Sequence, residues 1–199
     1  MSAATITPIP SSRGTLSRDF TAYLGMVIGL IVFGMLFAAL FFAYGVVRID
    51  APVWPPAGET RLPIALPFVN TMVLLASSAS AFMAARAVRD RRPAWRWLVE
   101  TLVLGAVFLG LQFVVWRGVW LSGLRPSSGI YGSVFYALTA IHAVHVLAGM
   151  IALLVMLVPA LRREGGLNER QRRAVGLCSM FWHFVDVVWV LMFFAVYVF

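Results

Sequence analysis

Four side chains that could do chemistry stand out because they recur at one spacing. His142 and His145 lie three residues apart, and His183 and Asp186 repeat that spacing near the end of the chain. Residues three apart share one face of a helix. Imidazole and carboxylate groups are ligands for zinc, copper or iron, and three such ligands with a water are typical of a catalytic site. A haem would instead take one histidine as its axial ligand. A metal or haem site is therefore one interpretation of these residues.

A second interpretation of the same four residues needs no metal. Asp186 lies deep in an apolar run, and an ionised carboxylate in hydrocarbon costs a few kcal/mol unless it finds a partner or a proton. His142, His145 and His183 are all the histidines of the chain, and each has a ring N–H that could donate to Asp186. We therefore predict a structural polar cluster near the membrane midplane that joins two helices. A lipid or proton role is the alternative that stays open beside the metal or haem site.

The composition fixes the kind of element that must position these residues. The chain has 199 residues, of which 61% are hydrophobic and 12% are charged, whereas soluble domains average about 45–50% and about 25%. This excludes a soluble enzyme, a disordered tail and a secreted disulfide scaffold. All 16 basic residues are arginines, and the formal net charge is +8. Because the arginines lie between long apolar runs, they indicate membrane topology and not nucleic-acid binding.

Five apolar segments are long enough to cross a bilayer, which takes roughly 20 residues in helical form. We predict an all-α, polytopic membrane helix bundle with five transmembrane helices. Residues 1–22 are expected to form a cytoplasmic N-terminal tail, and residues 23–199 a single five-helix domain. Pro63 and Pro67 are expected in the first turns of the second helix, where a missing N–H costs little. The five predicted spans are Tyr23–Val47, Leu62–Val88, Trp97–Leu121, Ile130–Leu161 and Ala174–Phe199.

The arginines predict the orientation of these spans. Twelve of them lie in the N-terminal tail and in the second and fourth connections, and four lie in the first and third connections. By the positive-inside rule, the N-terminus is cytoplasmic and the C-terminus faces outward. A rise of about 1.5 Å per residue then places both histidine-containing pairs near the midplane.

Further polar residues within the spans favour helix packing. Gln112 is expected to form an interhelical hydrogen bond. A stripe of small polar residues on the second helix is more typical of tight helix packing than of a permeation path; it consists of Asn70, Thr71, Ser77, Ser78 and Ser80. The sequence contains no phosphate-binding loop, no nucleophile with its base, and no paired catalytic carboxylates.

Several of these residues form blocks that resemble one family. Residues 181–189 read Phe-Trp-His-Phe-Val-Asp-Val-Val-Trp, which resembles the final-helix signature of subunit III of haem–copper oxidases and includes Trp182 and Trp189. Tyr131 and Gly132 open a segment similar to the start of the preceding helix, and His142-Ala-Val-His145-Val matches its H-x-x-H-V pattern. Further blocks in the same order are Trp54-Pro55-Pro56 and the segment from Pro67 through Asn70 and Thr71 to Ser77.

The resemblance implies a subunit without a redox centre. Five helices match the short bacterial form, which lacks the first two helices of the family. The resemblance places haems and copper in partner subunits I and II, and it implies bound phospholipid. We expect no metal or haem in this chain because its three histidines serve helix packing, and no nucleic acid because its arginines follow the membrane topology. The expected function is to support assembly, lipid binding and stability of a cytochrome c or quinol oxidase in aerobic electron transport. The expected location is the bacterial inner membrane, as a multi-pass protein.

The sequence departs from the family at two buried acids. Val32 and Phe33 occupy the positions of an acid in the first shared helix, and Val115 lies where a glutamate usually follows Gln112. These losses leave packing, lipid binding and assembly as the expected roles. They also raise an alternative, the related accessory protein of nitric oxide reductase systems. A stand-alone transporter or channel is a further alternative, although transporters usually have broken helices and paired charges at the midplane.

Overall fold

The computed structural model describes residues 13–54, 62–162 and 167–198, with the side chains of 13–19 left aside. Within these ranges it contains helices and no strand. The elements are α1 (Arg13–Asp50), α2 (Ala65–Arg89), α3 (Trp95–Leu121), α4 (Ile130–Arg162), α5 (Glu169–Phe193) and the short π-helix η1 (Phe194–Val198). Five of these helices are long and apolar enough to cross a membrane. The predicted all-α, five-helix class is therefore confirmed.

The helix ends differ from the predicted spans for local reasons. Helix α2 begins at Ala65 rather than Leu62, so Pro63 lies outside the helix and only Pro67 lies in its first turn. Helix α5 begins at Glu169 rather than Ala174, because Asn168 forms a capping box with Gln171 at the N-terminus. Helix α1 begins at Arg13 and thus includes the end of the segment predicted as a tail.

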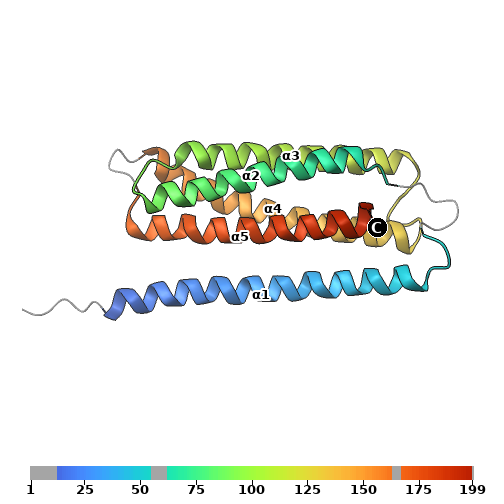
Figure 1. The fold of residues 1–199 in the computed structure, drawn as a ribbon, viewed down its shortest axis with the longest axis horizontal. Helices are drawn as coiled ribbons and strands as arrows, with labels where there is room; N and C mark the ends of the chain where they lie inside the picture. The colour runs from blue at the N-terminus through green and yellow to red at the C-terminus, as the bar shows by residue number, and fades with distance from the viewer. Residues whose placement is uncertain (1–12, 55–61, 163–166, 199) are drawn as a thin grey trace, which may run out of the picture.

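The helices alternate in direction, and four of them form the main bundle (Figure 1). Helix α2 packs most extensively against α3 and α5, and α4 packs against α5 and α3. Helix α1 lies along one side of this bundle, where it contacts α5 and α4 (Figure 1). The first turns of α1, α3 and α5 lie at the same end of the molecule as the last turns of α2 and α4.

This alternation gathers the arginine-rich segments at one end. The connection between α2 and α3 contains Arg91 and Arg92, and the first turns of α5 contain Arg170, Arg172 and Arg173. The C-terminus lies at the opposite end (Figure 1). This arrangement is the one on which the N-in prediction depends, and the orientation itself stays a prediction.

The bundle core is formed by large apolar side chains from α2, α3, α4 and α5. Trp182, Trp189, Phe108, Phe135 and Leu74 are among the largest side chains with almost no exposed surface. The outer surface is also apolar, as lipid or protein surroundings require; exposed residues of α1 include Ile28, Ile31, Met35, Phe42 and Ile49. The polar side chains that remain in the interior therefore need partners within the bundle.

Candidate functional site

The small polar stripe of α2 lies inside the bundle and faces α5 and α3. Asn70 and Ser77 have no exposed surface, and Thr71 and Ser80 are also buried. Their spacing follows the helical repeat, which brings them to the side of α2 that its two neighbours cover. Ser80 Oγ lies 2.8 Å from Thr101 Oγ1 of α3. The predicted role of this stripe in helix packing agrees with these contacts.

Two tryptophans of α5 donate hydrogen bonds to this stripe. Trp182 Nε1 donates to Ser77 Oγ at 2.8 Å, and Trp189 Nε1 donates to Thr71 Oγ1 at 3.0 Å. Because the tryptophans are seven residues apart, they lie two turns apart on one face of α5. We refer to these two bonds as the indole ladder. A buried indole N–H needs an acceptor, and hydroxyls on the facing helix supply it without a charge.

The ring of Trp182 lies where four helices meet. A Cβ atom at Gly105 of α3 would lie 2.9 Å from Trp182 Cη2, and one at Gly149 of α4 would lie 3.0 Å from Trp182 Cε3. Glycine at these two positions leaves the space that the indole fills. Trp182 therefore joins α5 to α2 by a hydrogen bond, and to α3 and α4 by close packing.

A buried amide pair links α2 to α3. Asn70 Nδ2 donates to Gln112 Oε1 at 3.4 Å, which confirms the predicted interhelical hydrogen bond of Gln112. Asn70 Oδ1 and Gln112 Nε2 have no hydrogen-bond partner among the described residues. The pair is weaker than the indole ladder, because its distance is at the long end for such a bond.

The structure places the four residues of the predicted cluster in three different surroundings. His183 faces α2, with Nδ1 2.6 Å from Ser78 Oγ and Nε2 3.3 Å from Ser179 Oγ. His145 Nδ1 lies 2.8 Å from the Ile141 carbonyl oxygen of its own helix, so that nitrogen is the donor. Its ring centroid lies 4.7 Å from that of Phe33 on α1.

His142 and Asp186 are buried without hydrogen bonds to the described residues. His142 is 1% exposed, Asp186 is 3% exposed, and neither ring nitrogen nor carboxylate oxygen has a partner. The ring of His142 packs instead among Phe37, Phe108 and Trp189.

The structure therefore differs from the expected bonding, in which an imidazole N–H donates to Asp186. His183 is hydrogen-bonded to Ser78 instead, and His145 donates to a backbone carbonyl of its own helix. These groups lie 2.6 and 2.8 Å from the two rings, whereas the Asp186 oxygens have no hydrogen-bond partner among the described residues. The spacing predicted which residues share a helix face, but the observed hydrogen-bond partners of the histidines differ from the expected Asp186.

Three further family-motif residues, Trp54, Tyr131 and Gly132, lie at the end opposite the arginine-rich segments. The Trp54 ring packs edge-on between Tyr44 and Tyr131, at centroid distances of 5.7 Å and 4.9 Å. Tyr44 Oη also donates to the Ala195 carbonyl at 2.9 Å, which ties α1 to η1. Gly132 is needed because a Cβ there would overlap the Arg125 carbonyl oxygen. Pro55 and Pro56 lie outside the described residues.

The two positions that lack the family's acids have ordinary apolar surroundings. Val32 is exposed on the outside of α1, whereas Phe33 packs against His145 and Phe181. Val115 is buried in the core. In the described part of the chain, no three His, Cys, Asp or Glu side chains gather as potential metal ligands.

Sequence reasoning missed the indole ladder and the glycines around Trp182. A weak signal for the ladder is present, because Thr71 and Ser77 on α2 are spaced almost as Trp182 and Trp189 are on α5. Nothing in the sequence distinguishes Gly105 and Gly149 from the other helical glycines, since the close approach depends on tertiary packing.

Comparisons with known proteins agree over nearly the whole chain. The family model described as cytochrome c oxidase subunit III matches residues 14–199. A cytochrome c oxidase subunit 3 from Thermostichus vulcanus is 34% identical over 178 residues, which cover 88% of this chain and 86% of that protein. A probable cytochrome c oxidase subunit 3 from Nocardia farcinica is 36% identical, with 92% and 90% covered. The corresponding protein from Mycobacterium bovis is 36% identical, with 96% and 94% covered.

Proposed function

The chain belongs to the cytochrome c oxidase subunit III family, as an accessory subunit of a terminal oxidase, and we propose that its role there is structural. In this proposal it packs beside the catalytic subunit I and near subunit II in the bacterial inner membrane. The haems and copper belong to those partners. It supports their assembly, binds phospholipid and stabilises the complex during oxygen reduction.

One observation carries the structural role. The polar side chains in the bundle interior are used mainly for contacts between helices, and the indole ladder is the clearest case. His183 and His145 are engaged with Ser78 and with a backbone carbonyl, and the ring of His142 is surrounded by aromatic rings. The histidines and tryptophans of the interior therefore serve contacts within the bundle, which supports a structural role.

The relatives also bear on the alternatives. The proteins that match are named for cytochrome c oxidase, so the comparisons do not favour an accessory role in a nitric oxide reductase system. The stand-alone transporter has no support in the described helices, since Asp186 is the one acid buried in their interior.

Metal analysis of the full chain tests the absence of a redox centre. The chain is purified away from its partners in detergent, and its zinc, copper, iron and haem contents are measured per polypeptide. We expect each to be far below one equivalent. About one equivalent of any of them, lost on replacement of His142 or His183 by Ala, would overturn the proposal.

A further inference from the structure

A basic cavity lies between the last turn of α2 and the first turns of α5, at the arginine-rich end of the bundle. It has a volume of about 430 Å³ and is lined by four arginines, one glutamate, and the small or apolar residues Ala85, Val88 and Gly176. The charged lining residues are Arg89, Arg91, Arg172, Arg173 and Glu169. Four guanidinium groups against one carboxylate leave a strong excess of positive charge, which favours an anionic ligand.

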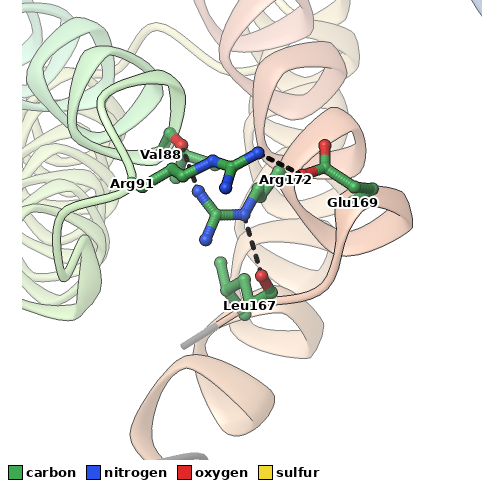
Figure 2. A network of polar contacts seen from close by, with 5 residues as sticks. All are labelled: Val88, Arg91, Leu167, Glu169 and Arg172. Atoms are coloured by element: carbon green, nitrogen blue, oxygen red, sulfur yellow. Dashed lines mark hydrogen bonds and ion pairs between the residues drawn. The ribbon is translucent and has the colours of Figure 1, made fainter. Parts of the chain in front are cut away.

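Arg172 is held in place at this cavity by backbone groups. Its Nη1 donates to the Val88 carbonyl at 2.9 Å, and its Nε donates to the Leu167 carbonyl at 2.8 Å (Figure 2). The first bond caps the C-terminus of α2, where a positive charge is favourable. These two bonds fix the guanidinium group between the two helices, so its position does not depend on a ligand.

Arg91 has a backbone conformation that residues with a Cβ rarely adopt. Its φ is +57°, and it occupies the position just beyond the C-cap of α2 where glycine is usual. The bonds from Arg91 N to Val88 O, at 3.3 Å, and from Arg92 N to Ala87 O, at 2.8 Å, identify a Schellman motif. Glycine would adopt this turn more easily, so an arginine here indicates a use for its side chain.

The Arg91 side chain reaches over the cavity to α5. One of its Nη atoms lies 3.6 Å from Glu169 Oε1, and both side chains are more than half exposed. In Figure 2 its guanidinium group lies next to that of Arg172. An exposed ion pair of this kind is weak and screened by salt. The Arg91–Glu169 pair therefore does not neutralise the neighbouring guanidinium groups of Arg91 and Arg172. An anion bound between these two groups would neutralise them.

The apolar part of the cavity indicates which anion fits. Gly176 is exposed, and a Cβ atom there would meet nothing within 4 Å. Together with the half-buried Ala85, it forms a notch on the side of the bundle, next to the arginines and within the apolar length of the helices. A free phosphate has no use for such a notch, whereas an acyl chain attached to the phosphate would lie in it. Basic pockets between transmembrane helices at a cytoplasmic face are known to hold anionic lipid headgroups.

We propose that this cavity binds the phosphate of an anionic phospholipid, with an acyl chain against Ala85 and Gly176. The inference names the site and the headgroup charge for the phospholipid binding included in the proposed function, and it rests on that function. Arg172 provides the fixed contact to the phosphate, and Arg89, Arg91 and Arg173 add charge around it.

The test measures lipid binding to the full chain, purified in detergent and stripped of lipid. Native mass spectrometry gives the dissociation constants of phosphatidylglycerol and of phosphatidylcholine with the same acyl chains. We expect phosphatidylglycerol to bind about tenfold more tightly. Equal binding of the two lipids to the wild-type chain would overturn the proposal without reference to any variant.

Paired variants locate the site. Arg89→Gln with Arg91→Gln removes two charges from the cavity, and the preference for phosphatidylglycerol should then fall to about twofold or less. The matched control, Arg92→Gln with Arg96→Gln, removes two charges at the same end of the bundle but outside this cavity. It should leave the preference unchanged. If the two double variants behave alike, the preference is a general effect of charge and the site is wrong.

A third variant separates a lipid from soluble phosphate. Gly176→Leu fills the notch and replaces a glycine within a helix, so we expect it to fold and to weaken phosphatidylglycerol binding. Inorganic phosphate should displace the lipid poorly from the wild-type chain. Ready displacement by millimolar phosphate, with Gly176→Leu unchanged, would assign the cavity to a soluble anion and overturn the lipid. Because these measurements use the chain alone, their failure is distinct from a failure to associate with an oxidase.

Discussion

Gly105 and Gly149 lack a side chain at the two positions where α3 and α4 face the ring of Trp182. At the scale of single residues, these contacts leave no free space beside the indole ring. A methyl group at Gly105 would approach the indole to 2.9 Å, a distance at which one of the two must move. Trp182 has little room to move, because its Nε1 is bonded to Ser77 and its surface is almost completely buried.

The first prediction follows from this contact. Gly105→Ala should destabilise the chain by about 1–3 kcal/mol, because overpacking outweighs the gain in helix propensity. Gly118→Ala is the control, since a Cβ there meets nothing within 4 Å, and it should be neutral or slightly stabilising. Thermal unfolding of the full chain in detergent measures both. Equal midpoints for the two variants would contradict the packing described around Trp182.

The second prediction concerns Asp186, whose carboxylate oxygens have no hydrogen-bond partner among the described residues. A carboxyl at this depth without a hydrogen-bond partner takes a proton, so Asp186→Asn replaces one neutral group by another of the same shape. We expect the free energy of unfolding of this variant to differ from that of the wild-type chain by less than about 1 kcal/mol, as measured from the thermal midpoint. Oxygen consumption per haem should be nearly unchanged. If Asp186→Asn abolishes turnover while the subunit stays bound, Asp186 has a proton role and the packing account fails.

At the scale of helices, the indole ladder provides two buried hydrogen bonds between α2 and α5. The third prediction is that Trp182→Phe and Trp189→Phe each destabilise the chain by about 1 kcal/mol. Each loses a hydrogen bond between membrane helices, of average strength about 0.6 kcal/mol, together with some packing. Trp95→Phe is the control, because Trp95 is 37% exposed at the start of α3. If thermal unfolding in detergent gives the same midpoint for all three variants, the indole ladder does not stabilise the chain.

The helices show what sequence reasoning can and cannot predict here. Apolar length sets the helix number, because hydrocarbon admits few other structures. The start of α5 was predicted too late, since Arg170, Arg172 and Arg173 interrupt the apolar run; the Asn168 and Gln171 pair was the better signal. The hydrogen-bond partner of a side chain was harder to predict than the helix face on which it lies. Spacing puts His183 and Asp186 on neighbouring positions of α5, but Ser78 on another helix is the group that His183 contacts.

At the scale of the whole molecule, the alternation of the helices brings the arginine-rich segments to one end (Figure 1). The fourth prediction is that this end is cytoplasmic and that the C-terminus faces outward. A reporter that fluoresces only in the cytoplasm, fused after Phe199, should be dark. The same reporter inserted after Arg92, in the connection between α2 and α3, should be bright. A bright C-terminal fusion would show that the orientation is wrong.

The outer surface of the bundle exposes many large apolar side chains. Helix α1 exposes large apolar residues along its length, including Ile31, Met35 and Phe42. A polar connection to the bundle lies at the end opposite the arginine-rich segments, where Tyr44 and Arg48 donate to the Ala195 carbonyl. Apolar surfaces of this kind suit lipid and a protein partner, and a subunit of an oxidase has both around it.

The most direct test of the account is to isolate the full chain through an affinity tag in mild detergent and to record the absorbance of what is bound. The account predicts that haem absorbance and oxygen consumption copurify with the tag, at about one copy of this chain per catalytic subunit. Metal and haem should then stay with the partners when the chain is separated from them. A colourless chain that is recovered alone from membranes containing an intact oxidase would contradict the account.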